Sequence, residues 1–142
     1  MKRISSRRLL AATLCTGVAA VAALSGVAVA QAPALKRTLV TRADVSVPGR
    51  EAVVAAVEVA AGGVADWHTH PGEEISYVTE GQSVLLIAGQ PPRTVSAGEA
   101  FVIPAGVVHS ARNESNAPCK LVGVYVVEKG KPLASPAPAP AN

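Results

Sequence analysis

The most constraining feature of this sequence is the absence of any long segment with apolar residues at helical spacing. Between residues 38 and 128 the chain consists instead of short runs rich in β-branched residues, with turn residues every eight to twelve positions. Such runs are typical of the strands of a β-sandwich or barrel. We therefore predict an all-β domain with strands at 38–47, 52–61, 74–79, 83–88, 93–95, 100–103, 108–113 and 120–128.

The first 30 residues have the composition of a secretory signal peptide. Residues 1–8 carry four cations and no acid, residues 9–27 are apolar, and residues 28–30 read Ala-Val-Ala, a sequence that signal peptidase accepts. We expect cleavage after Ala30 and a periplasmic or secreted protein. The Arg7-Arg8 pair resembles a twin-arginine export signal, so this route and ordinary secretion both stay open. The alternative interpretation is a retained membrane anchor.

Charge and length of the remaining chain restrict its partners and its organisation. Residues 31–142 carry nine Lys or Arg and ten Asp or Glu, a net charge of −1, against +3 for the whole chain. This balance gives no basis for binding nucleic acid, or a membrane once the leader is cleaved. A chain of this length supports one domain. We place an N-terminal arm at 31–37, the domain at 38–131 and a disordered Pro/Ala-rich tail at 132–142.

The mature chain contains a single thiol, that of Cys119. It therefore forms no internal disulfide, although it is directed to an oxidising compartment. We expect Cys119 to be a packed small side chain rather than a nucleophile.

All three histidines lie in the predicted domain. His68 and His70 are two positions apart on an extended segment, so their side chains project from the same face. Glu74 follows a Pro-Gly turn, from which a returning strand can direct its carboxylate to the same point. His109 follows a Pro-x-Gly turn further along the chain. These four side chains could close a single metal site.

Two spaced motifs in this region resemble the two conserved motifs of the cupin superfamily. The first is G-x5-HTH-x3-E-x6-G over residues 62–81, and the second is G-x5-PAG-x2-H-x3-N over residues 98–113. The sixteen residues between them suit a compact, single-domain cupin. The resemblance implies a jelly-roll β-barrel. It also implies turn roles for Gly81, Gly98 and Gly106, and a backbone-supporting role for Asn113.

The resemblance further implies that His68, His70, Glu74 and His109 bind one divalent metal ion. Without a metal, a buried group of three imidazoles and a carboxylate would lose its hydration at a high free-energy cost. The mixed nitrogen and oxygen donors, with no thiolate, suit Fe, Mn, Ni, Cu or Zn, and the identity of the metal stays open. Four ligands leave two positions free on an octahedral ion but close the sphere of tetrahedral zinc.

Side-chain alternation along the predicted strands defines the expected interior. It predicts a narrow, apolar pocket with few acids or bases beyond the four ligands. Ser76 and Val78 should share the face of Glu74, and Phe101 and Ile103 should also point inward, whereas Ile75 and Tyr77 should point away.

The cupin superfamily includes oxygenases, decarboxylases, isomerases, lyases and binding proteins, so the fold does not determine the function. We expect an exported, metal-dependent, dioxygenase-like enzyme acting on a small organic molecule, with Glu74 as a catalytic residue that accepts a proton. One alternative is a non-catalytic periplasmic cupin that binds a small ligand or a metal, which an apolar interior favours. Another is a metal-dependent isomerase or lyase.

The predicted strand at 38–47 would leave an exposed sheet edge in a barrel of this size. Trp67, Ile75 and Tyr77 could supply apolar contacts to a second copy of the chain. We therefore expect a homodimer.

Overall fold

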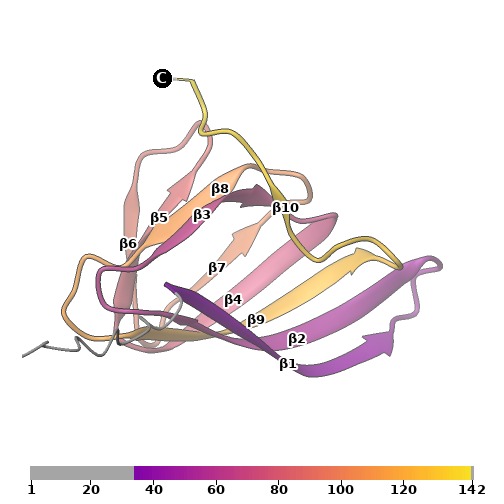
Figure 1. Cartoon of the computed structure of the whole chain (residues 1–142). Coiled ribbons are helices and arrows are strands. Elements are labelled where there is room, and N and C mark those ends of the chain that lie inside the picture. Colours follow the sequence, from indigo (N-terminus) through magenta and orange to yellow (C-terminus); the bar gives the residue numbers. More distant parts are fainter. Residues whose placement is uncertain (1–33, 142) are drawn as a thin grey trace, which may run out of the picture. The chain divides into compact units, whose positions relative to one another are not determined.

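The computed structural model describes residues 34–141, and the predicted signal peptide with its cleavage after Ala30 lies outside these residues. Residues 34–141 form ten strands in two five-stranded sheets (Figure 1). Within this range no helix is long and apolar enough to span a membrane. The strands are β1 (Leu35–Asp44), β2 (Arg50–Val59), β3 (Val64–Thr69), β4 (Gly72–Glu80), β5 (Gln82–Ile87), β6 (Arg93–Ser96), β7 (Ala100–Ile103), β8 (His109–Arg112), β9 (Cys119–Glu128) and β10 (Ser135–Pro136).

The two sheets interleave distant parts of the chain. The first has the order β1-β2-β9-β4-β7 and the second the order β10-β3-β8-β5-β6. Every strand pair is antiparallel. The two sheets face each other as two layers (Figure 1). This arrangement confirms the predicted all-β jelly-roll fold.

Alternation of buried and exposed residues along the strands builds the core between the layers. In β4 the residues Glu74, Ser76 and Val78 are buried, whereas the intervening Ile75 and Tyr77 are 44% and 49% exposed. The same period of two holds in β2 and in most of β9. The main buried apolar cluster takes residues from both sheets: Val59, Val78, Leu85, Val95, Ile103 and Cys119.

Cys119 is completely buried in this cluster as a small apolar side chain, as predicted. Phe101 and Ile103 point into the core and Val102 is exposed, which also agrees with the predicted orientations. These agreements follow from strand alternation alone.

Both ends of the domain differ from the predicted boundaries. β1 begins at Leu35, so the last residues of the predicted arm belong to the first sheet, and its register shifts between Leu39 and Thr41. The tail is ordered through β10, which pairs with β3, and the backbone N–H of Ala137 donates to the carbonyl of Trp67 at 2.9 Å. The prediction of a disordered tail is therefore wrong for this part, because backbone pairing requires no apolar periodicity.

Candidate metal centre

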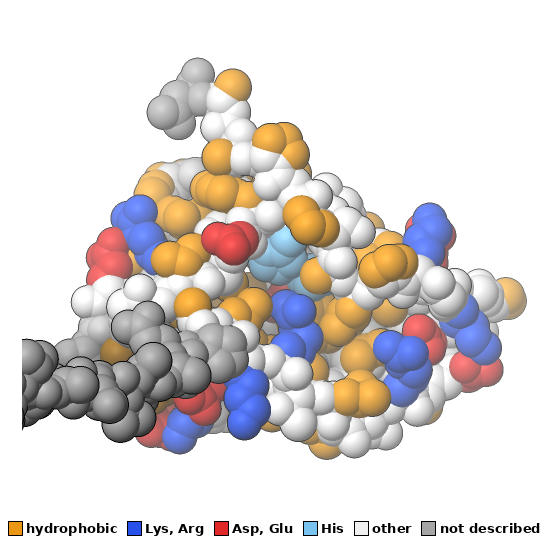
Figure 2. Space-filling view, viewed as in Figure 1, with side chains coloured by type: hydrophobic (Ala, Val, Ile, Leu, Met, Phe, Trp, Pro, Cys, Tyr) orange, Lys and Arg blue, Asp and Glu red, His pale blue; other side chains and the backbone are white. Residues whose placement is uncertain are grey.

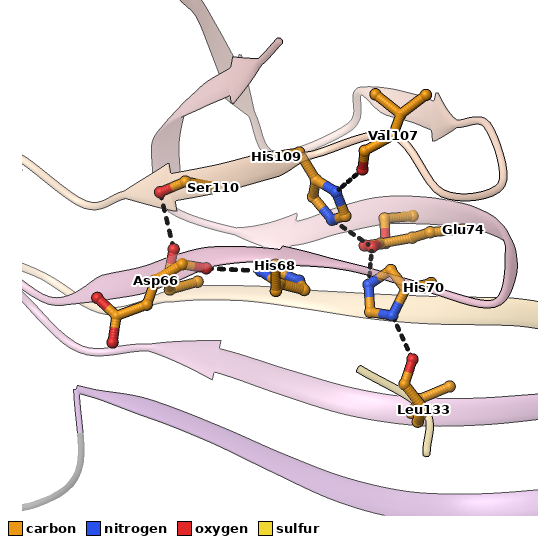
Figure 3. A network of polar contacts seen from close by, with 10 residues as sticks. Asp66, His68, His70, Glu74, Val107, His109, Ser110 and Leu133 are labelled. Carbon is orange, nitrogen blue, oxygen red and sulfur yellow. Dashed lines mark hydrogen bonds and ion pairs between the residues drawn. The ribbon is translucent and has the colours of Figure 1, made fainter. Parts of the chain in front are cut away.

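Three neighbouring strands bring the four predicted ligands together (Figure 3). His68 lies in β3 opposite His109 at the start of β8, and His70 follows the end of β3. Glu74 reaches the same point from β4 in the other sheet. One ligand atom from each residue lies within 4.8 Å of the others. His70, Glu74 and His109 are buried and His68 is half-buried.

The turn between the ligands His70 and Glu74 requires glycine for steric reasons. A Cβ at Gly72 would overlap the backbone of Val126 in β9, so only glycine allows β4 to lie this close to β9. The carbonyl of His70 accepts a 3.0 Å hydrogen bond from the N–H of Gly106. The turn glycines implied by the motifs, Gly81, Gly98 and Gly106, have positive φ angles of 71°, 92° and 72°.

Backbone carbonyls determine which ring nitrogen of each histidine carries the proton. Each Nδ1 contacts a carbonyl oxygen: Asp66 for His68 at 2.6 Å, Leu133 for His70 at 2.5 Å and Val107 for His109 at 2.9 Å. A carbonyl oxygen only accepts hydrogen bonds, so each Nδ1 donates its proton away from the centre and each Nε2 is directed toward the centre. Metal-binding histidines are usually oriented in this way.

The carboxylate of Glu74 has two different environments. Its Oε1 accepts a 2.6 Å hydrogen bond from Ser76 Oγ. Its Oε2 lies 2.9 Å from His70 Nε2 and 3.2 Å from His109 Nε2. Burial raises the pKa of Glu74, but the contacts with His109, His70 and Ser76 outweigh burial and hold this pKa well below its usual range. Glu74 is therefore an ionised carboxylate with Oε2 directed at the imidazoles.

This arrangement fits a metal ion. With each Nδ1 directed at a backbone carbonyl, the three Nε2 atoms and the carboxylate of Glu74 converge on one centre, where His109 Nε2 lies within hydrogen-bond distance of Glu74 Oε2. The buried Nε2 of His70 has no hydrogen-bond partner among the described residues, despite its short distance to Glu74. Burial lowers the pKa of His68 to about 4, so this ring stays in the neutral form that binds metals. A cation placed among these donors would satisfy all four.

A small cavity and a larger groove adjoin this centre. The cavity, of about 40 Å³, is bordered by His68, Glu74 and His109. The groove, of about 480 Å³, lies outside it and is lined in part by His68, Asp66 and Trp67. Because His68 borders both, the groove lies next to the metal centre. Figure 2 shows histidine at the bottom of a hollow, between an acidic and a basic side chain.

The cavity is small and mostly apolar, as predicted, and two titratable side chains besides the four expected ligands border it. Tyr125 lies opposite Glu74 in the β4–β9 register, with its ring centroid 4.8 Å from that of His70. Burial, reinforced by the charge of Glu74, raises the pKa of Tyr125 to about 12, so the phenol stays protonated. Arg37 of β1 lies over this ring, with Cζ 5.8 Å from the centroid.

The sequence contained only weak signals for these two residues. Alternation along β9 places Tyr125 on one face together with Val127, but the pairing of β9 with β4 has no local signature. Arg37 lay in the segment interpreted as an arm. The backbone-supporting role implied for Asn113 agrees with its side-chain hydrogen bonds to the carbonyls of Val59 (3.1 Å) and Ala117 (2.7 Å).

Comparison with known proteins decides the family. Residues 55–127, about half of the chain, match the cupin domain. The chain belongs to the cupin family. Among curated proteins, this cupin is 33% identical over 95 residues to a germin-like protein, subfamily 2 member 2, of Arabidopsis thaliana, covering 61% of this chain and 43% of that protein. The chain spans less than half the length of each of the curated relatives it matches.

Solved structures show the same fold. A protein with a double-stranded β-helix domain from Klebsiella pneumoniae subsp. pneumoniae is 20% identical, with a TM-score of 0.62, covering 74% of this chain and 85% of that one. An oxalate oxidase in complex with the substrate analogue glycolate is 26% identical, with a TM-score of 0.58, covering 71% of this chain and 55% of the oxidase.

Proposed function

We propose that this cupin binds one divalent metal ion through His68, His70, Glu74 and His109 and converts a small organic molecule in a dioxygenase-like reaction. The convergence of one ring nitrogen from each of three histidines and a carboxylate oxygen of Glu74 within 4.8 Å carries this proposal. The similarity to an oxalate oxidase supports an enzymatic use of such a centre. The ion, once bound, would supply Lewis-acid and oxygen chemistry.

The residues of the chain contribute binding, orientation and proton handling. The cavity is too small for a large molecule, so the reacting group would occupy it while the rest of the substrate lies in the groove. Tyr125 stays protonated and would donate a hydrogen bond. Glu74 would act as a catalytic residue only after giving up its contacts with His70 and His109, because those contacts keep its basicity low.

The first experiment is elemental analysis of the protein purified from its own compartment, without added metal or affinity chelation. We expect about one Fe, Mn, Ni or Cu per chain, and oxygen uptake with a suitable substrate. The variant Glu74→Gln should lose metal, whereas the control Glu73→Gln, whose side chain is exposed, should retain it. A wild-type protein without metal, or a Glu74→Gln variant with full metal content, would contradict the proposal.

Turnover separates catalysis from binding alone. His109→Ala should abolish any product formed by the wild type, because it removes one metal donor. The non-catalytic binding cupin predicts a bound metal or ligand and no product with any substrate. An isomerase or lyase predicts product without oxygen uptake. Arg37 and Tyr125 at the cavity favour catalysis over binding alone, because they add a cation and a hydrogen-bond donor.

We also propose export and homodimerisation. The composition of residues 1–30 supports export to the periplasm or outside the cell, and changing Arg7 and Arg8 to Lys should block it if the twin-arginine route is used. The exposed apolar side chains of Ile75, Tyr77 and Val102 on β4 and β7 support a dimer contact. Small-angle scattering at micromolar concentration should give the mass of a dimer, and the mass of a monomer would refute this assembly.

A further inference from the structure

We propose that Arg37 recognises a carboxylate of the substrate, so that the molecule converted is a small organic acid bound between the metal centre and this guanidinium. The inference rests on the proposed function, because the metal centre supplies the second anchoring point. It adds a substrate class and the residue that selects it.

The position of Arg37 is the first argument. β1 pairs this residue with Val57 in β2, and the side chain borders both the inner cavity and the outer groove. His68 is the only metal-centre residue that borders both spaces. Because Arg37 also borders both, a molecule that occupies the two spaces lies beside Arg37. The pairing of β1 with β2 and the ring of Tyr125 fix the place of the guanidinium.

The unsatisfied hydrogen-bonding capacity of Arg37 is the second argument. Its Nε is buried and has no hydrogen-bond partner within residues 34–141. No carboxylate in this range forms an ion pair with it, whereas Arg42 pairs with Glu51 at 3.6 Å and Arg112 with Glu114 at 2.6 Å. Because buried donors are normally paired, the free Nε of Arg37 indicates a missing acceptor. A carboxylate accepts from Nε and a terminal nitrogen at once, in the bidentate geometry that guanidinium favours.

The charge and the size of the cavity are the third argument. The cavity is lined by one cation, Arg37, and one anion, Glu74. A divalent ion would therefore give this space a net charge of +2, which favours an anionic ligand. A water molecule needs about 10–15 Å³, so a cavity of about 40 Å³ has room for the ion and one small polar group only. A carboxylate has this size and sign.

The test measures binding of oxalate to the Mn(II)-loaded protein by calorimetry, with the neutral diamide oxamide and inorganic phosphate as comparison ligands. We expect the wild type to bind oxalate and to bind oxamide and phosphate far more weakly. Arg37→Gln should weaken oxalate binding roughly 10- to 100-fold, because it removes a charge-assisted bidentate contact. The oxalate affinity of Arg37→Lys should lie between those of the wild type and Arg37→Gln, because lysine keeps the positive charge but loses the bidentate geometry of the guanidinium.

Lys36→Gln is the matched control, because it removes a cation from the adjacent, exposed position of the same strand. It should bind oxalate like the wild type. Mn(II) stoichiometry, measured first, should be the same in all four proteins. A wild type that binds no metal overturns the proposed function. If wild type and Arg37→Lys both have full metal content and bind oxalate equally well, only the role of Arg37 is overturned. Arg37→Lys gives this answer even if Arg37→Gln does not fold. Phosphate binding as strong as oxalate binding overturns the carboxylate specificity.

Discussion

Ending the chain at Pro132 should weaken metal binding by 10- to 100-fold without abolishing it. The deletion removes the carbonyl of Leu133, which accepts the 2.5 Å hydrogen bond from His70 Nδ1. The acceptors for His68 and His109 lie only two residues away from them in the chain, so those two rings keep their orientation. Of the four proposed ligands, only His70 thus loses the hydrogen bond that orients its ring.

The magnitude follows from what such support contributes elsewhere. Loss of an outer hydrogen-bond partner of a metal ligand typically lowers affinity 10- to 100-fold, which corresponds to about 1.4–2.8 kcal/mol. Water can replace the Leu133 carbonyl only if it reaches His70, whose side chain is 1% exposed. The loss of β10 and of the Ala137 N–H to Trp67 carbonyl bond also removes backbone pairing from the edge of β3.

The assay is competition for Co(II) against a chromophoric chelator, together with thermal melts of the metal-free proteins. Two controls separate the carbonyl from other effects. A chain ending at Pro138 keeps all of these contacts and should bind metal like the full chain. Leu133→Ala keeps the carbonyl but loses the half-buried side chain that packs on a second buried cluster, formed by Val53, Ala55, Val57, Tyr125 and Val127. This substitution should lower the free energy of unfolding by about 1–2 kcal/mol and leave metal affinity unchanged. The loss is smaller than the about 2–5 kcal/mol for replacing a fully buried leucine by alanine. Equal affinities for chains ending at Pro132 and Pro138 would refute the reasoning.

Three further predictions concern the centre and its supports. Gly72→Ala should destabilise the protein by about 1–3 kcal/mol in denaturant titrations, because its methyl group overlaps the backbone of Val126; an unchanged midpoint would be inconsistent with the close approach of β4 and β9. Ser76→Ala should raise the pKa of Glu74 and lower metal affinity, because Oε1 loses its donor; carboxylate infrared titration of the metal-free protein reports this pKa. The metal-free protein should lose stability as the pH falls from about 6.5 to about 4, because His68 binds a proton in the unfolded chain but not in the fold; His68→Asn should flatten this slope in melts at a series of pH values.

The grouping of the four side chains was in large part predictable from the sequence because most of the relevant geometry is local. His68 lies in β3 and His70 directly after its end, two positions further along an extended segment, and Ser76 stands two positions after Glu74 in β4, so alternation predicts a common face for each pair. Phe101 and Ile103 follow the same rule. The resemblance to the cupin motifs added His109, which no local spacing connects to the others.

The supports of the site were not predictable because they depend on long-range pairing and on the backbone. The acceptor for His70 is a main-chain carbonyl, which any residue at position 133 would provide. Tyr125 reaches the site only through the register of β9 against β4. Arg37 depends on where β1 begins, and the apolar pattern of that strand is weak because most of it is exposed.

The position of β9 has a consequence for the order in which the molecule is assembled. This strand lies between β2 and β4, so two strands made early in the chain remain unjoined until residues 119–128 are available. The other neighbour of β4 is β7, with only four residues. During synthesis from the N-terminus, Glu74 therefore has no fixed position relative to the imidazoles until β9 has docked. Under the proposed function, metal capture at full affinity would therefore be a late event that marks a completed domain, because an unfinished chain would offer the ion only imidazoles that are not yet held in place.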